Sequence, residues 1–221
     1  MKIFRKLLLL TFCSAIAITS CSQESKKPFY KEIQAFKAAD KQHPPPQNAI
    51  LFVGSSSFAM WQNVQTYFPE YPIINRGFGG SGLKDAIEYE DDIIAPYHPK
   101  QVVIYSGEND IAVNISANDV LQRFTTLFNM IRRDLPDASV VYISIKPSPS
   151  RQKFMPAMES ANAMIKKFLS AKKNTTFVDV YHKMLDASGN PRSELFREDM
   201  LHMKRVGYEI WKEAIQPVLL K

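Results

Sequence analysis

The sequence predicts one α/β domain, a three-layer α/β/α sandwich around a five-stranded, mostly parallel sheet. Two observations predict this fold. Five short apolar runs lack the alternation of polar and apolar residues, which is typical of strands buried on both faces. Helical stretches separate these runs, and strands that alternate with helices form a parallel sheet covered on both sides. A length of 221 residues suits one such domain, because domains typically contain roughly 100–200 residues.

The individual elements follow from the local pattern, in chain order. The strands are expected at Ala49–Val53, Tyr71–Asn75, Gln101–Tyr105, Ser139–Ile145 and Thr175–Val180. The helices are expected at Phe29–Gln42, Phe58–Thr66, Leu83–Ile94, Ala117–Leu135, Pro156–Lys172 and Lys204–Leu219. Between 120 and 135 the apolar residues recur on one helical face and arginines occupy the others, as in a helix packed against a core. The prolines at 44–46 end the first helix, because proline cannot donate the helical hydrogen bond.

The first 20 residues have the pattern of a secretory signal peptide. Three basic residues precede an apolar stretch at 7–18, which is too short to span a membrane. The stretch ends Ile18-Thr19-Ser20-Cys21, which resembles a bacterial lipobox, where the cysteine is lipidated and becomes the new N-terminus. We therefore expect an exported protein that a lipid on Cys21 anchors in the membrane, on the periplasmic side or at the cell surface. A plain signal peptide, in which Cys21 has no role, is the alternative.

This processing sets the expected domain boundaries and the charge. Residues 1–20 are the signal peptide, 21–30 a polar tether and 31–221 the folded domain. The chain carries 28 Lys+Arg against 22 Asp+Glu, a net charge of +6, and loss of the three basic residues leaves 25 against 22, a net of +3. No basic cluster with interleaved aromatic residues remains, so nucleic acid is not an expected partner.

Cysteine chemistry is excluded by the same processing. Cys13 leaves with the signal peptide, and Cys21 would carry the lipid. The mature domain then has neither a free thiol nor a disulfide, so cysteine catalysis and a disulfide-rich scaffold are both ruled out.

The segment after the first expected strand contains a candidate nucleophile. Ligands of such sheets bind outside the carboxyl ends of the strands, so the residues that follow each strand are the informative ones. Here they read Gly54-Ser55-Ser56-Ser57, just before a helix. A serine on such a turn has an exposed hydroxyl near backbone amides, as nucleophilic catalysis requires. Serines that merely cap the helix are an equally weighted alternative.

The segment after the second strand is rich in glycine. Gly77, Gly79 and Gly82 satisfy the dinucleotide-binding pattern G-x-G-x-x-G between a strand and a helix. A dinucleotide site of this kind also needs an acidic residue at the end of the next strand, and none stands there, near Tyr105. An exported protein also has little access to nicotinamide dinucleotides. We therefore interpret this segment as a loop whose bare backbone amides closely approach another group.

The third strand and the C-terminal region supply further polar candidates. Asn109, in the segment Ser106–Asp110, offers a neutral N–H donor suited to an oxyanion, although an Asx-type turn is favoured for this segment alone. Asp199 and His202 are three residues apart, so one turn brings the carboxylate to imidazole Nδ1 and leaves Nε2 as a base.

The other histidines are less promising as catalytic residues. His43 and His98 lie next to prolines, and His182 follows a strand with no acid expected beside it. We interpret all three as structural or solvent-exposed. The four histidines do not have the spacing of a metal site, so no metal ligand is assigned.

Taken together, the four segments resemble the SGNH/GDSL hydrolase family, which has a flavodoxin-like fold. The resemblance covers nearly the whole chain from about residue 48. It implies that Ser56 is the nucleophile and that Asp199 and His202 complete a catalytic triad. It also implies an oxyanion hole made by the backbone N–H groups of Ser56 and Gly80 and the side chain of Asn109. No metal or organic cofactor is implied.

One position departs from the family pattern. The first block of the family usually reads Gly-Asp-Ser, whereas Ser55 stands at the aspartate position here. That aspartate is not the triad acid, so the departure removes no catalytic group. The choice of Ser56 as the nucleophile, and not a neighbouring serine, comes from the alignment to the family.

The resemblance implies an exported serine ester hydrolase whose partner is a small-molecule ester. Cleavage of small acyl esters is expected, with O-acetyl groups of carbohydrates and lysophospholipid esters both open as substrates. A catalytically degenerate, carbohydrate-binding relative and a nucleotide-binding α/β module are the alternatives. The loop Lys146–Arg151 either borders the substrate pocket or is a rigid connection fixed by its prolines, and the latter is the default.

Overall fold

The computed structural model describes residues 27–221, so the predicted signal peptide and Cys21 lie outside the described residues. Two compact units divide the chain, one ending at Gln42 and the other running from His43 to Lys221. The first contains helix α2 (Tyr30–Gln42). The division falls after this helix, whereas the sequence places the helix inside the folded domain of residues 31–221. The predicted signal peptide, tether and folded domain stay a prediction.

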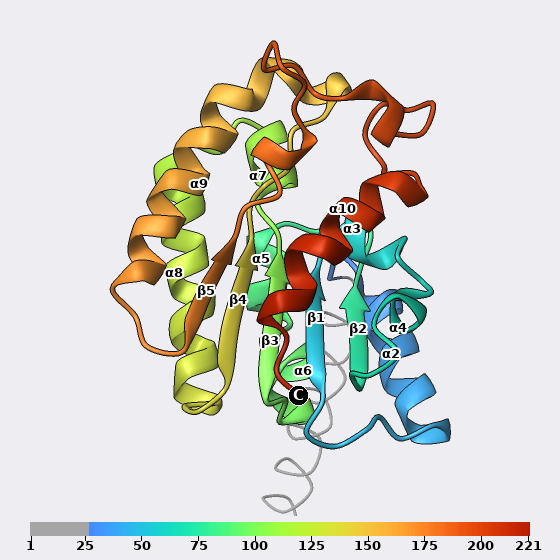
Figure 1. Ribbon diagram of the computed structural model, residues 1–221. Helices are drawn as coiled ribbons and strands as arrows, with labels where there is room; N and C mark the ends of the chain where they lie inside the picture. Colours follow the sequence, from blue (N-terminus) through green and yellow to red (C-terminus); the bar gives the residue numbers. More distant parts are fainter. Residues whose placement is uncertain (1–26) are drawn as a thin grey trace, which may run out of the picture. The chain divides into compact units, whose positions relative to one another are not determined.

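The unit from His43 onward is built on a five-stranded sheet (Figure 1). The strand order is β2-β1-β3-β4-β5, and every neighbouring pair is parallel. The strands are β1 (Ile50–Gly54), β2 (Ile73–Gly77), β3 (Gln101–Tyr105), β4 (Ser139–Ile143) and β5 (Thr175–Val178). The predicted α/β fold class with a parallel sheet is therefore confirmed.

Helices connect the strands and cover both faces of the sheet. The α-helices of this unit are α3 (Ser56–Ala59), α4 (Val64–Tyr67), α5 (Leu83–Glu88), α6 (Glu90–Ile93), α7 (Glu108–Ala112), α8 (Ala117–Asp134), α9 (Met155–Ser170) and α10 (Arg205–Ile215). Short 3-10 helices lie at Ala95–Tyr97, Pro149–Phe154, His182–Met184, Ser193–Leu195 and Gln216–Val218. Among residues 27–221, no helix is both long and apolar enough to cross a bilayer.

Two expected helices are each broken into two shorter ones. The helix expected at Phe58–Thr66 is replaced by α3 and α4, and the break between them lets Trp61 turn into the core, where its ring stacks at 4.8 Å on Tyr208. The helix expected at Leu83–Ile94 is interrupted at Tyr89, whose backbone leaves helical geometry while its ring is buried. In both places, burial of one aromatic ring overrides the helical pattern.

One face of the sheet packs against α3, α4 and α10 through aromatic side chains. Successive residues of a strand point to opposite faces, and Phe52 and Tyr105 point to this one. Phe58 of α3 and Trp211 of α10 meet them, with ring centroids 6.0 Å apart for Phe58–Trp211 and 4.6 Å for Tyr105–Trp211. The C-terminal helix, which crosses in front of the sheet in Figure 1, is fixed to the first and third strands by this cluster.

The opposite face packs against α5, α8 and α9. Tyr142 of β4 meets Phe124 of α8 at 4.7 Å between ring centroids, and Phe168 of α9 contacts the same ring of Phe124 at 6.0 Å. Figure 1 shows α8 and α9 side by side along this flank. Covered on both faces, the central strands are fully buried, which explains why their sequences lack polar alternation.

Glycine is required where β1 ends, because a neighbouring strand leaves no room for a side chain. A Cβ atom on Gly54 would lie 1.9 Å from the carbonyl oxygen of Tyr105. In the sheet register, Gly54 pairs with Tyr105 on β3 and with Gly77 on β2. The three strands therefore end at the same level, and the segments that follow them start side by side.

Glu90 on α6 is a buried acid at the other edge of the fold, where α6 and α8 precede the starts of β3 and β4. Neither carboxyl oxygen of Glu90 has a hydrogen-bond partner among the described residues. Burial raises the pKa of Glu90 to about 7, and the charges of Asp134 and Asp91 add to this effect. Asp134 itself is paired with Arg133 at 2.5 Å.

We expect Glu90 to make the protein less stable as the pH rises from about 4.5 to about 7. In this interval the unfolded chain releases the proton while the folded chain keeps it, so folding becomes less favourable at higher pH. Glu90→Gln should remove this dependence and raise the free energy of unfolding at pH 8 by about 1–3 kcal/mol. Urea denaturation at pH 5 and pH 8 measures the effect. Glu213→Gln, at an exposed position of α10, is the control, and an unaltered pH profile for Glu90→Gln would contradict the assignment.

Candidate active site

Ser56 lies at the start of the short helix α3, immediately beyond the end of β1. The backbone N–H of Ser55 donates to the carbonyl of Tyr105 at 3.1 Å, which extends the β1–β3 pairing by one residue and fixes the turn. Ser55 occupies the N-cap position, yet its side chain makes no capping hydrogen bond. The capping interpretation of this segment is therefore wrong for Ser55, and the hydroxyl of Ser56 is left half-exposed at the sheet edge.

Asp199 and His202 lie in a tight turn just before α10. The two oxygens of the Asp199 carboxylate have separate partners: Oδ1 accepts the backbone N–H groups of Leu201 and His202, both at 2.9 Å, and Oδ2 lies 2.6 Å from Nδ1 of His202. These hydrogen bonds hold the pKa of Asp199 well below its usual range, the bond from the imidazole having the largest effect. The carboxylate is thus ionised and orients the imidazole, so that Nε2 points away from it.

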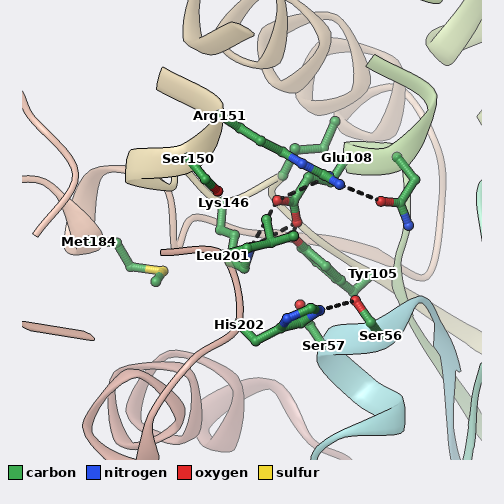
Figure 2. A network of polar contacts seen from close by, with 12 residues as sticks. Ser56, Ser57, Tyr105, Glu108, Lys146, Ser150, Arg151, Met184, Leu201 and His202 are labelled. Carbon is green, nitrogen blue, oxygen red and sulfur yellow. Dashed lines mark hydrogen bonds and ion pairs between the residues drawn. The ribbon is translucent and has the colours of Figure 1, made fainter. Parts of the chain in front are cut away.

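The structure brings Ser56 and His202 together across 146 residues of sequence. Nε2 of His202 lies 3.1 Å from Oγ of Ser56, within hydrogen-bond distance (Figure 2). Together with the Asp199 contact, this gives an unbroken line from carboxylate to imidazole to hydroxyl. Such a line lets the imidazole accept the hydroxyl proton while the carboxylate stabilises the resulting cation.

Helix α10 fixes the turn that carries His202 relative to the helix that carries Ser56. The hydroxyl of Tyr208 donates to the carbonyl of Ser57 at 2.9 Å, which ties the helix after His202 to the helix that carries Ser56. Tyr208 also stacks on Trp61 at 4.8 Å. The serine turn and the histidine turn are therefore joined by a buried contact beside the site as well as by the core.

Gly80, in the loop after β2, and Asn109, on α7 after β3, line one surface hollow. Nδ2 of Asn109 donates to the carbonyl of Ser81 at 2.9 Å, which leaves its second N–H for another acceptor. Gly80 is exposed and has a positive φ of 83°. The hollow has a volume of about 190 Å³ and is lined by Gly80, Gly82, Lys84, Asp85, Asn109, Asp110, Val113 and Arg123.

The Asx-type turn expected around Asn109 is wrong, because the segment forms helix α7 instead. Gly107 precedes this helix at a φ of 114°, in the left-handed region that favours glycine, and a Cβ there would lie 2.9 Å from Ile145. The side chain of Asn109 is consequently free to reach across to Ser81 instead of bonding to its own backbone.

The glycine-rich loop does not offer a pyrophosphate site, because protein carboxylates already bind its amides. The backbone N–H of Leu83, at the start of α5, donates to Oδ2 of Asp110 at 2.9 Å, and the N–H of Gly82 donates to Asp85 at 2.7 Å. Asp110 is paired in turn with Arg123 at 2.6 Å. These amides are the groups that a dinucleotide would need, so the glycine pattern here serves close contact within the protein.

The loop Lys146–Arg151 is more than a connection fixed by prolines. Lys146 is buried, and its Nζ lies 2.9 Å and 2.8 Å from the two carboxylate oxygens of Glu108. Burial alone would raise the pKa of Glu108, but the charges of Lys146 and Arg151 outweigh it and hold this pKa below its usual value. Sequence reasoning missed this network. A lysine directly after a buried apolar strand was the available signal, since a buried lysine needs a carboxylate partner.

His182 also has an acid beside it, contrary to the expectation from the sequence. Its Nδ1 lies 2.7 Å from Oδ2 of Asp179, in the same three-residue spacing as the pair at 199 and 202. The side chain of His182 is 65% exposed, and within residues 27–221 no serine forms a hydrogen bond with it. The interpretation as a solvent-exposed residue therefore holds, while the absence of a nearby acid was wrong.

Metal-binding potential in the described part of the chain is confined to the acidic group Glu90, Asp91 and Asp134. Their carboxylate oxygens lie within 4.8 Å of one another. The group lies at the edge opposite to Ser56, where Asp134 ends α8 ahead of β4. Asp134 already has Arg133 as its ionic partner.

Comparison with known protein families identifies the chain. Residues 51–210 match the GDSL-like lipase/acylhydrolase family, a span that begins within β1 and includes Ser56 and the turn with Asp199 and His202. The chain belongs to this family. As a GDSL-like acylhydrolase it is an ester hydrolase, as expected from the motifs.

Solved structures share the fold of this GDSL-like acylhydrolase. A protein from Streptococcus pneumonia named for platelet activating factor superposes with a TM-score of 0.76 at 22% identity, covering 93% of this chain and 99% of that one. A GDSL-like lipase from Bacteroides thetaiotaomicron gives 0.72 at 20% identity over 84% and 95%. An acetylxylan esterase from Geobacillus stearothermophilus gives 0.64 at 14% over 79% and 96%. No curated protein matches the chain.

Asp199→Asn should lower kcat for ester hydrolysis by about 10²–10⁴. The amide cannot accept the Nδ1 proton as the carboxylate does, so the imidazole loses the tautomer in which Nε2 accepts a proton from Ser56. Steady-state kinetics with an aryl acetate measures the effect. The control is Asp179→Asn, which breaks the matching pair with His182 and should leave kcat unaltered; equal losses in both variants would contradict the assignment.

Proposed function

We propose that the protein is an exported serine esterase that cleaves small acyl esters, with Ser56, His202 and Asp199 as its catalytic triad. The observation that carries this proposal is the line of contacts from Ser56 Oγ to His202 Nε2 at 3.1 Å and from His202 Nδ1 to Asp199 at 2.6 Å. A surface serine alone is a weak nucleophile, and an oriented imidazole at this distance is what activates it.

The proposed reaction proceeds through an acyl-enzyme. Oγ of Ser56 attacks the ester carbonyl carbon while Nε2 of His202 takes the hydroxyl proton. The tetrahedral intermediate collapses, and the alcohol leaves with that proton from His202. Water then attacks the acyl carbonyl carbon while His202 takes a proton from it, and His202 returns this proton to Oγ of Ser56 as the carboxylic acid leaves. Asp199 stays ionised throughout, in keeping with its lowered pKa.

The oxyanion would be held by the backbone N–H groups of Ser56 and Gly80 and by the second N–H of Asn109. Support comes from the shared hollow of Gly80 and Asn109 and from the bond to Ser81, which leaves one N–H of the amide uncommitted. Donors that are already fixed stabilise developing charge without reorganisation in the reaction.

A small acyl group fits the hollow beside Asn109. Its volume of about 190 Å³ is below the roughly 300–1,000 Å³ of pockets that enclose drug-sized ligands. Charged side chains line it, namely Lys84, Asp85, Asp110 and Arg123. An acetyl group fits such a space better than a long acyl chain, and the charged side chains among its mostly apolar walls can bind the hydroxyls of a sugar. We therefore favour O-acetyl groups of carbohydrates over lysophospholipid esters.

Export and anchoring complete the proposal. The basic start, the apolar stretch at 7–18 and the lipobox-like end at Cys21 support a lipoprotein signal. A lipid on Cys21 would hold the esterase at a membrane on the outer side of the cell, where polymeric carbohydrates are accessible. The polar residues after Cys21 would serve as the tether.

Ser56→Ala should abolish hydrolysis of a short-chain aryl ester, with kcat lowered by at least about 10⁴. Wild-type protein should also be labelled on Ser56 by a serine-directed organophosphonate, located by mass spectrometry. The neighbouring Ser55→Ala, at a buried position without a capping bond, is the control and should keep its label. An inactive, unlabelled wild type would instead support a degenerate carbohydrate-binding protein.

A substrate panel tests the preference for acetylated carbohydrates. At matched concentrations, acetylated xylo-oligosaccharides should be cleaved with a higher kcat/KM than lysophospholipids. The reason is that the hollow is small and lined by charged groups. Released acetate and released fatty acid are measured separately. A higher kcat/KM for the lysophospholipid would show that the acyl group binds elsewhere.

A further inference from the structure

The segment Lys146–Arg151 contacts Asn109 on one side and the turn that carries Asp199 and His202 on the other. In Figure 2, Lys146 and Arg151 approach Glu108 on the side of the network opposite to Ser56. Lys146 lies three residues beyond the end of β4, and Arg151 lies in the 3-10 helix Pro149–Phe154. None of these side chains belongs to the triad.

Arg151 binds the end of the Asn109 amide that does not donate. Its Nη2 donates to Oδ1 of Asn109 at 2.9 Å, while Nδ2 of Asn109 donates to the carbonyl of Ser81 at 2.9 Å. A guanidinium has only donors and a backbone carbonyl only accepts, so both partners impose the same orientation on the amide. Without Arg151, rotation that exchanges the oxygen and the nitrogen would be opposed only by Ser81.

Arg151 is itself held by a buried acid. Its Nη1 lies 3.3 Å from Oε1 of Glu108. Lys146 binds both oxygens of this carboxylate, and the hydroxyl of Tyr105 donates to Oε2 at 2.5 Å. Burial raises the pKa of Tyr105, so this hydroxyl keeps its proton. Glu108 is thus held by the last residue of β3 and by the segment after β4, and its fixed carboxylate binds Arg151.

The same segment is fastened to the turn that carries the catalytic acid and base. The backbone N–H and the hydroxyl of Ser150 both donate to the carbonyl of Met200, at 3.1 Å and 2.9 Å. Met200 has a φ of 53°, a strained value for this residue. The neighbour of Arg151 therefore secures the turn between Asp199 and His202, so the segment keeps Asn109 and the triad in one arrangement.

We propose that Arg151 is a positioning residue for the oxyanion hole, which holds the Asn109 amide so that its free N–H faces the oxyanion formed at Ser56. This inference rests on the proposed function, because it gives Asn109 the role of a donor. Charge supports it as well: a cation on the amide oxygen polarises the amide and makes its N–H a stronger donor. A buried ion pair such as Lys146–Glu108 adds little net stability. We interpret its role as holding the carboxylate that positions Arg151.

The test is a double-mutant cycle of Arg151→Met and Asn109→Ala, with kcat and KM measured on an aryl acetate. Removing an oxyanion donor outright costs about 10²–10³ in kcat, so a loosened donor should cost less, roughly 10–50-fold for Arg151→Met, with KM within about twofold of the wild type. In the Asn109→Ala background the same substitution should change kcat by less than about threefold, because the group it positions is gone.

Controls separate positioning from loss of structure. Lys153→Met removes a charge from the same 3-10 helix at an exposed position and should leave kcat unaltered. If Arg151→Met does not fold, as judged by thermal unfolding, Arg151→Lys replaces it in the cycle. Lysine keeps the charge beside Glu108 but lacks the fork that spans Glu108 and Asn109, so a loss of kcat that depends on Asn109 is again expected.

Three outcomes would overturn the proposal. An unaltered kcat in Arg151→Met shows that Asn109 needs no support. Equal losses with and without Asn109 show that Arg151 acts through another group, and a raised KM at constant kcat shows that it binds substrate. In each case the wild type is active and Ser56→Ala is not, so the proposed esterase function still stands. An inactive wild type would remove both.

Discussion

The close pairing of β1 with β3 and β2 is the constraint on which the rest of the site depends. Gly54 lies opposite Tyr105 and Gly77, with no space for a side chain against the Tyr105 carbonyl. Because the three strands end level, the serine turn, the glycine loop and α7 all begin at one edge of the sheet. The bond from the amide of Asn109 to Ser81 and the bond from Leu83 to Asp110 both connect loops that this register brings together.

Asp199 and His202 reach the same edge by a different route. The turn with Asp199 and His202 follows no strand, and its position depends on α10, which the aromatic cluster of Trp61, Tyr208 and Trp211 packs against the sheet. Apolar packing is not directional, so it alone would not place an imidazole to within hydrogen-bond distance. The directional contacts of Tyr208 with Ser57 and of Ser150 with Met200 supply that accuracy.

The sequence was sufficient for the sheet and for the residues that meet at its edge. Strands buried on both faces have an apolar run that few other elements share. The polar segments after these strands each left an alternative role open and indicated a catalytic site only when taken together. It was not sufficient for the breaks at Trp61 and Tyr89, where an aromatic ring finds space that only the assembled core provides. The helix at Glu108–Ala112 was also missed, because its glycine and polar residues are typical of a turn.

Side-chain partners across the fold were the least predictable feature. Glu108 and Lys146 are 38 residues apart, and nothing local to either residue indicates the other. The Asp–His pairs at 179–182 and 199–202 have the same spacing and the same local contact. Only the fold distinguishes them, because it places a serine beside the second pair.

That duplication has a consequence for chemical probes of this protein. The side chain of His182 is 65% exposed and that of His202 20%. A reagent that acylates imidazoles according to their accessibility would therefore react at His182 before His202. When the protein is titrated with such a reagent, histidines would be modified before activity falls. The number of histidines modified at full inactivation would therefore exceed the number that activity requires.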